Sequence, residues 1–116
     1  MPPVLPHTVT LREVAPRDGF QSLAEVLPTA FKLDLIRHAA EAGLSEIEVT
    51  SAVSARLLPQ LADCGDVLAG LEGLDITRAV LAPTIGRAET AIAAGADQIV
   101  AFLSATEGHN RANVKR

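Results

Sequence analysis

The sequence predicts an α/β fold with a parallel sheet, because strand-like and helix-like segments alternate along the chain. Runs rich in β-branched and apolar residues are separated by segments with apolar residues at helical spacing. Strands joined through helices form right-handed βαβ units, so they run parallel. The pattern fits a doubly wound open sheet or part of a (β/α)8 barrel, which normally takes about 250 residues. With 116 residues, 48% of them hydrophobic, the chain can form one modest domain.

The first half of the chain contains two predicted strands and the start of a helical region. Residues 8–14 are rich in β-branched residues and form the first strand. A helix is expected from residue 28 to about residue 42, followed by a glycine that ends it. Residues 46–50 form the second strand, and residues 55–71 begin a further helical region. Apolar residues recur at helical spacing in the first helix: Phe31, Leu35, Ile36 and Ala39.

The second half continues the alternation. Breaks are expected in the helical region near Pro59 and near Gly65. Residues 75–82 form the third strand, residues 86–94 a short helix, and residues 98–104 the fourth strand. The count is therefore four strands and three helices.

Composition and charge exclude several classes of function. The net charge is −4 with no basic stripe, so nucleic acid is not an expected partner. No apolar run reaches the length of about 18 residues that a membrane span needs, and the first residues lack the pattern of a signal peptide. The lone Cys64 excludes an internal disulfide and favours a reducing compartment. These features predict a cytoplasmic protein.

Polar residues gather after the carboxyl ends of the predicted strands. The segment 13–21 reads Glu-Val-Ala-Pro-Arg-Asp-Gly-Phe-Gln and places Arg17, Asp18 and Gln21 directly after the first strand. Parallel α/β folds build their active sites at this edge. An isolated Arg-Asp-Gly is more often a surface ion pair, so the wider distribution is what favours a site. The other polar residues are Glu48, Thr50, Ser51, Ser104, Thr106, Glu107, His109 and Asn110.

Alternation along the second strand predicts a carboxylate that points into the interior. Ile47 and Val49 share one face of this strand, whereas Glu48 and Thr50 share the other. A barrel strand is buried on both faces, and a buried carboxylate needs a partner. Arg17, one strand over, is the candidate partner. The alternative is an edge strand on which Glu48 faces solvent.

Other candidate residues favour structural roles. Glu13 lies deeper in the first strand and is expected to be an internal structural partner. Glu107 and His109 are metal ligands by residue type, but loop residues that cap the next helix are the favoured interpretation. Cys64 lies in a helix-like segment, where a free thiol usually contributes to packing.

The segment 13–21 resembles the first-strand signature of the DRE-type TIM-barrel metallolyases. That superfamily contains the hydroxymethylglutaryl-CoA lyases, the isopropylmalate and homocitrate synthases and the carboxyltransferase domain of pyruvate carboxylase. Later motifs in order are most similar to the hydroxymethylglutaryl-CoA lyases, and the resemblance covers nearly all of the chain after residue 8. Phe20 stands where leucine is usual, and Ala15 where glycine is common. The later motifs are residues 41–51, 50–54 with 58–63, 79–84 with 93–96, and 104–107 with 110–114.

The resemblance implies a partial (β/α)8 TIM barrel with about the first four strands and three helices. Residues 1–7 are then a flexible N-terminal segment, and residues 8–116 are the N-terminal half of a lyase domain. A fourth helix is expected to follow Arg116, where the sequence ends. The family's His-x-His metal ligands, its metal-binding asparagine and its catalytic cysteine loop belong to the later half and do not occur in this sequence.

The resemblance also implies a reaction and a site. The reaction is the retro-Claisen cleavage of 3-hydroxy-3-methylglutaryl-CoA to acetyl-CoA and acetoacetate, with Mg²⁺ or Mn²⁺ as cofactor. Arg17 matches the arginine that stabilises the enolate, Glu48 positions it, and Asp18 is a metal ligand. One carboxylate cannot hold a hexacoordinate ion tightly, so the isolated chain is expected to have weak or no activity. The implied substrate-binding residues are Gln21, Thr50 and Ser51.

Two other functions remain open. A Claisen-type synthase of the isopropylmalate or homocitrate kind keeps the fold and changes the substrate, although residues 59–63 favour the lyases. A non-catalytic half-barrel module that pairs with itself is the third possibility. The expected partners are an acyl-CoA substrate and either a second copy, in a homodimer, or a missing C-terminal half. Neither nucleic acid nor membrane is expected.

Overall fold

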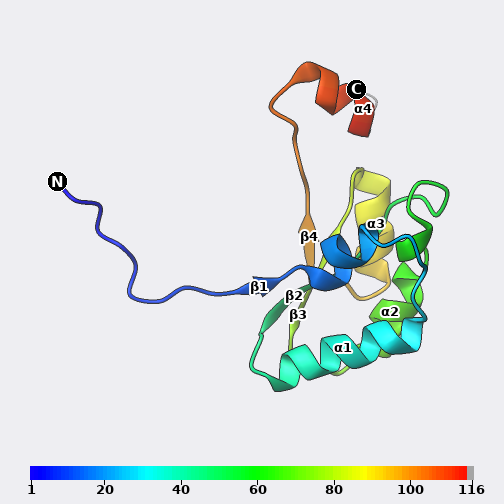
Figure 1. Cartoon of the computed structure of the whole chain (residues 1–116), viewed down its shortest axis with the longest axis horizontal. Coiled ribbons are helices and arrows are strands. Elements are labelled where there is room, and N and C mark those ends of the chain that lie inside the picture. Colours follow the sequence, from blue (N-terminus) through cyan, green and yellow to red (C-terminus); the bar gives the residue numbers. More distant parts are fainter. Residues whose placement is uncertain (115–116) are drawn as a thin grey trace.

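The computed structural model describes residues 1–114 and contains a four-stranded parallel sheet with helices beside it (Figure 1). The strands follow one another in the order β1-β2-β3-β4. This consecutive order is that of a barrel segment, whereas a doubly wound sheet reverses its order at a switch point. The predicted α/β class and parallel sheet are confirmed. The strands are β1 (Arg12–Glu13), β2 (Glu46–Ser51), β3 (Thr77–Leu81) and β4 (Gln98–Val100).

Three α-helices connect the strands, and a fourth follows β4. The first and third lie close to their predicted positions. The fourth begins inside the chain, so Glu107 and His109 lie in its first turn and not in a loop before it. No helix within residues 1–114 is both long and apolar enough to cross a membrane. The helices are α1 (Thr29–Glu41), α2 (Cys64–Gly70), α3 (Ile85–Ala93) and α4 (Glu107–Val114).

Three strands are shorter than their sequence pattern predicts. Residues 8–11 stay outside β1, because β2 offers no strand residue before Glu46. Residues 101–104 stay outside β4, because β3 ends opposite Val100. β3 itself is shorter than the expected 75–82. A strand extends only as far as a neighbouring strand supplies hydrogen bonds. The residue pattern of one segment cannot predict where its neighbour ends.

The region 55–71 contains one short helix and two tight turns. Residues 55–57 form a turn, and Pro59–Leu61 form a 3-10 turn, η2. The expected break at the proline is confirmed. The second break, expected near Gly65, occurs at residues 62–63, and Gly65 itself lies in the first turn of α2. Glycine lowers helix propensity by about 1 kcal/mol, which the burial of Val67 and Leu68 in this helix outweighs.

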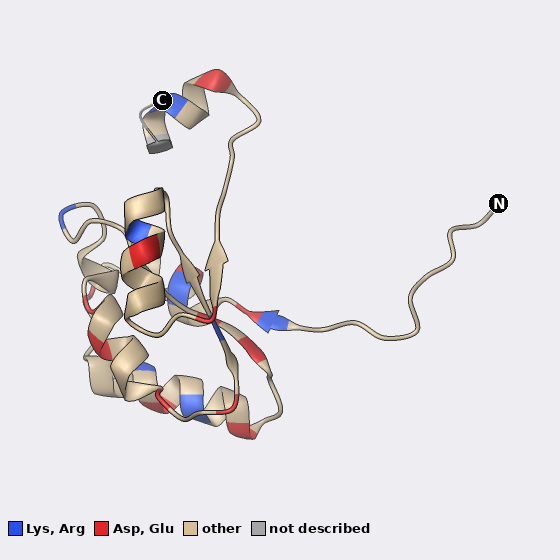
Figure 2. Ribbon diagram, turned by 180° about the vertical axis from the view of Figure 1, so that it is seen from behind, with Lys and Arg blue, Asp and Glu red and all other residues tan. Residues whose placement is uncertain are grey.

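The hydrophobic core lies between the sheet and helices α1 to α3. Buried residues from each layer meet there, and Figure 1 shows these helices gathered on one side of the strands. Acidic and basic residues are interspersed along the helices (Figure 2). The core therefore fixes the sheet from its helical side and leaves the other side to the polar residues of the strands. Its members include Ile36, Ile47, Val49, Val67, Leu68 and Val80.

A bulge in β2 reverses part of the predicted alternation. Glu48 and Thr50 pair with consecutive residues of β3, which leaves Val49 as the additional residue. Thr50 therefore faces the helices with Val49, and its hydroxyl lies beside the thiol of Cys64 at the start of α2. The prediction that Thr50 shares the face of Glu48 is wrong. By alternation after the bulge, Ser51 returns to that face.

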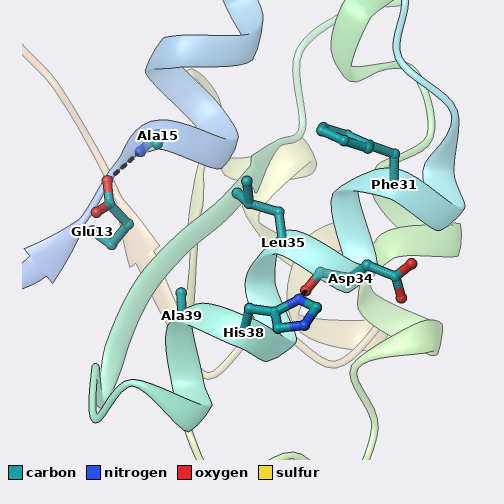
Figure 3. A pocket seen from close by; sticks show the side chains of 7 residues that line it. All are labelled: Glu13, Ala15, Phe31, Asp34, Leu35, His38 and Ala39. Atoms are coloured by element: carbon teal, nitrogen blue, oxygen red, sulfur yellow. Dashed lines mark hydrogen bonds between the residues drawn. The ribbon is translucent and has the colours of Figure 1, made fainter.

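Helix α1 has a second apolar face that residues 1–114 leave open. Of its four apolar residues at helical spacing, Ile36 is fully buried in the core. The other three, Phe31, Leu35 and Ala39, line a groove that also includes Glu13 (Figure 3). A single apolar stripe predicted from spacing is therefore divided between the core and an open groove.

Candidate active site

A π-helical turn, η1 (Ala15–Gly19), carries Arg17 to the carboxyl end of the sheet. It follows β1 directly. The side chain of Glu13 accepts hydrogen bonds from the backbone N–H groups of Val14, at 2.9 Å, and Ala15, at 2.8 Å. These bonds fix the chain where it leaves the strand. The role of Glu13 is structural, as predicted, but it is local, because this partly buried side chain bonds only the backbone that directly follows it.

Arg17 and Glu48 form an ion pair just past the end of β1, with Glu48 in the middle of β2. The Nε group of Arg17 donates a hydrogen bond to Oε1 of Glu48 at 2.6 Å. The side chain of Glu48 is 4% exposed and that of Arg17 is 18% exposed. A carboxylate buried to this degree is costly without a partner, and Arg17 supplies one. The pairing predicted from strand alternation is confirmed.

Two further residues of the predicted site contact the same guanidinium. Nη1 of Arg17 donates to Oδ1 of Asp18 at 3.1 Å and to Oε1 of Gln21 at 3.5 Å. Within residues 1–114, Nη2 of Arg17 donates no hydrogen bond. Guanidinium has five N–H donors and a permanent charge. Arg17 is therefore held in place by three side chains and still has donors for an anionic oxygen.

A cavity of about 540 Å³ lies in front of Arg17. Its size is in the range of small-molecule sites. Its wall is mostly apolar and comes from the loop after β2, the ends of β3 and β4, and α4. The sequence reasoning missed this wall; its only local signal is the apolar pair Leu57-Leu58 before a proline. The lining residues are Arg17, Gln21, Val53, Leu57, Leu58, Leu81, Pro83, Phe102 and Ala112.

Two residues predicted to bind substrate do not line this cavity. Thr50 is 1% exposed and faces α2, on the other side of the sheet. Ser51 is fully buried, and its Oγ donates to the backbone carbonyl of Leu81 at 3.2 Å. The structure thus brings together Arg17, Asp18, Gln21 and Glu48, and it places Thr50 apart from them.

The carboxylates at this site do not make a metal centre by themselves. Within residues 1–114, no three side chains of the His, Cys, Asp and Glu types come together as a cation site. Glu48 is occupied by Arg17, and the side chain of Asp18 is 64% exposed. A hexacoordinate divalent cation needs several oxygen ligands. The described residues offer one carboxylate that could serve.

Cys64 belongs to the packing and not to the site. It packs against the hydrophobic core. Burial raises the pKa of its thiol above the ordinary value, and the nearby charge of Asp63 acts in the same direction. The Thr50 hydroxyl beside the thiol opposes the shift, although this buried oxygen has no hydrogen-bond partner of ordinary geometry among the described residues. A thiol that is hard to deprotonate is a poor nucleophile.

Comparison with known proteins gives a consistent result. The sequence profile of the HMGL-like family matches residues 8–116. The chain is 44% identical over 111 residues to the mitochondrial hydroxymethylglutaryl-CoA lyase of Rattus norvegicus, covering 95% of this chain and 34% of the relative. It is 42% identical over 113 residues to the cytoplasmic 3-hydroxy-3-methylglutaryl-CoA lyase of Mus musculus, covering 97% of this chain and 33% of the relative.

Solved structures agree with the sequence relatives. The HMG-CoA lyase of Brucella melitensis superposes with a TM-score of 0.86 at 41% identity, over 93% of this chain and 38% of that one. Another solved HMG-CoA lyase, 37% identical with a TM-score of 0.86, is a complex with coenzyme A and 3-methylmalate. The chain spans about one third of the length of the curated relatives it matches. The predicted partial (β/α)8 barrel is confirmed, and the chain belongs to the HMGL-like family.

Proposed function

We propose that this chain forms part of a carbon–carbon lyase that cleaves 3-hydroxy-3-methylglutaryl-CoA to acetyl-CoA and acetoacetate. The observation that carries the proposal is the ion pair of Arg17 with Glu48, 2.6 Å between Nε and Oε1, at the edge of a cavity. The names of the relatives support the same reaction, and the complex of one relative with coenzyme A supports an acyl-CoA substrate.

Arg17 supplies fixed positive charge where the reaction develops negative charge. Cleavage of the carbon–carbon bond leaves an enolate on the thioester oxygen of the acetyl-CoA product. A preorganised cation that donates hydrogen bonds to that oxygen lowers the barrier, because the charge exists only in the transition state and after it. Glu48 and Gln21 hold the guanidinium in place, so it does not have to reorganise during the step.

The proposal includes a divalent cation, Mg²⁺ or Mn²⁺, most of whose ligands are not among the described residues. Asp18 is exposed beside Arg17 and would contribute one hard oxygen ligand. The other ligands have to come from elsewhere in a complete protein. The isolated chain is accordingly expected to bind such a cation weakly and to show weak or no cleavage.

The remaining expectations are parts of the same proposal. The substrate is an acyl-CoA, and the rest of a barrel or a second copy in a homodimer completes the site. A cytoplasmic location stays a prediction, since the relatives include cytoplasmic and mitochondrial enzymes. Leucine degradation and ketone-body metabolism are the processes that such a lyase would serve.

A chimera tests the proposal. Residues 8–116 replace the matching part of the Brucella melitensis lyase, whose fold they share. The purified chimera is assayed for cleavage of 3-hydroxy-3-methylglutaryl-CoA and, separately, for condensation of 2-oxoacids with acetyl-CoA. We expect cleavage without condensation. A folded chimera that condenses and does not cleave would favour the synthase, and one that does neither would favour a non-catalytic module.

A further inference from the structure

The loop after β2 forms one wall of the cavity without being part of a strand or a long helix. It includes residues 53–58, from which Val53, Leu57 and Leu58 line the cavity. Leu57 is 70% exposed, so its own burial does not hold the loop. The loop therefore needs an attachment elsewhere to keep this wall in front of Arg17.

A buried lysine provides that attachment. Lys32 projects from the second turn of α1 and is 2% exposed. Its Nζ donates to the backbone carbonyl of Gln60 at 2.6 Å and to Oδ1 of Asp63 at 2.7 Å. An ammonium group has three donors, and two of them are used, one by the backbone of η2 and one by Asp63, which directly precedes α2.

The attachment extends to both sides of the lysine. Oδ2 of Asp63 accepts a hydrogen bond from Oγ1 of Thr29, in the first turn of α1, at 2.6 Å. Nε2 of Gln60 donates to the backbone carbonyl of Leu23 at 2.8 Å. The start of α1, the loop before it and the loop after β2 are thereby joined around one buried charge.

We propose that Lys32 is a positioning residue that fixes the loop after β2 as the wall of the substrate cavity. The inference rests on the proposed function, in that the cavity before Arg17 is taken as the substrate site. Replacement of a buried ion pair by apolar residues is often neutral for stability, so stability alone does not explain this arrangement. The donation to the Gln60 carbonyl is the specific feature, because it acts on the backbone of η2, which directly follows residues 53–58.

A tryptophan reporter measures the position of the loop directly. The chain has no Trp and no Tyr, so Leu57→Trp gives fluorescence without background. A matched reporter, Ile92→Trp, lies on α3, where Ile92 is 58% exposed. Each reporter is combined with Lys32→Met, and the anisotropy is measured on the whole chain. We expect the anisotropy to fall clearly for the reporter at position 57 and to stay unchanged for the reporter at position 92.

Trypsin gives a second readout at the same loop. Arg56 is exposed beside Leu57, and cleavage after it needs local opening of the loop. Lys32→Met should raise the rate of cleavage after Arg56 about tenfold. The control is Arg37→Met, because Arg37 also bonds a backbone carbonyl from α1, that of Gly70, but does not touch this loop. Cleavage after Arg56 should be unchanged in this control.

A double variant separates positioning from stability. Lys32→Met with Asp63→Leu removes both charges and should recover much of the unfolding free energy. If the pair were merely structural, the anisotropy at position 57 would recover as well. If Lys32 positions the loop, the anisotropy stays low, since the Gln60 carbonyl still lacks its donor.

A milder variant keeps the test decisive if Lys32→Met does not fold. Thr29→Val removes one hydrogen bond to Asp63 and should raise cleavage after Arg56 about two- to threefold. The inference would be overturned by equal changes in anisotropy at positions 57 and 92. An unchanged rate of trypsin cleavage after Arg56 in both Lys32→Met and Thr29→Val would overturn it as well. No substrate enters these measurements, so an inactive chimera would contradict the proposed function and leave this result unaffected.

Discussion

Among residues 1–114, two ion pairs have a buried member, and they differ in what surrounds them. Lys32, on α1, and Asp63, directly before α2, lie on the helical side of the sheet, with side chains 2% and 18% exposed. Protein groups donate hydrogen bonds to both carboxylate oxygens of Asp63. Arg17 and Glu48 lie at the carboxyl end of the sheet, 18% and 4% exposed, beside a cavity. In the first pair the cation is the enclosed member, and in the second it is the anion.

This difference separates an architectural pair from a chemical one. An enclosed cation that bonds backbone and carboxylate oxygens holds segments together and has little left to offer a ligand. An enclosed anion that holds a partly open cation orients that cation toward the cavity. The predictions below test this contrast, beginning with the largest expected effect.

Removal of the enclosed cation should have the largest effect on stability. Lys32→Met leaves the carboxylate of Asp63 without its charged partner, and breaking a buried pair on one side costs about 3–5 kcal/mol. Urea unfolding followed by circular dichroism measures the loss. A cost below about 1 kcal/mol would place this pair with ordinary surface ion pairs.

Neutralisation of the enclosed anion should cost less. In Glu48→Gln, the guanidinium of Arg17 keeps Asp18 and Gln21 as partners and keeps its access to solvent. The expected loss is about 1.5 kcal/mol, the lower end for a hydrogen bond to a charged group. The same urea titration measures it. A loss larger than that of Lys32→Met would reverse the contrast between the two pairs.

A third ion pair, Arg78 with Asp97, is more open to solvent and should make stability depend on pH. Arg78 lowers the pKa of Asp97 below its ordinary value of 3.8, chiefly through a hydrogen bond. The carboxylate therefore contributes its full stability above pH 3.8, and the contribution is lost as the pH falls through the lowered folded pKa. Unfolding free energies measured from pH 2 to 6 should fall less steeply for Asp97→Asn. Identical slopes would contradict this prediction.

The smallest expected effect concerns the reactivity of Cys64. Because burial raises the pKa of the thiol above 9.0, the native chain should react with a disulfide reagent at pH 8 more slowly than the urea-unfolded chain does. Lys32→Met should increase this rate through local opening of the start of α2, because Asp63, which Lys32 holds, directly precedes Cys64. The absorbance of the released thiolate follows the reaction. Equal rates in the native and unfolded chains would show that the thiol is not protected.

Features set by local sequence were predictable, and features set by pairing were not. Helix α1 was placed correctly because apolar spacing and Gly43, with a φ of 101°, mark its course and end. The pairing of Arg17 with Glu48 was predictable from alternation and from the cost of an unpartnered buried carboxylate. The ends of β1 and β4 depend on where a neighbouring strand stops, which lies far away in the sequence.

Two features around the site lay beyond local reasoning. The bulge that turns Thr50 toward α2 changes alternation by one residue, and no glycine or proline marks it. The contact of Lys32 with Asp63 joins residues 31 positions apart, and nothing in either segment specifies the other. Both features became visible only when the strands and helices were placed together.

The central claim is that the guanidinium of Arg17 stabilises the enolate through its fixed set of N–H donors as well as its charge, and one substitution tests it most directly. Arg17→Lys in the chimera keeps a positive charge but loses the planar set of donors. We predict that kcat for cleavage of 3-hydroxy-3-methylglutaryl-CoA falls about 10²- to 10³-fold, with an unchanged circular dichroism spectrum. A kcat within about twofold of the unsubstituted chimera, less than 0.5 kcal/mol of barrier, would contradict the claim.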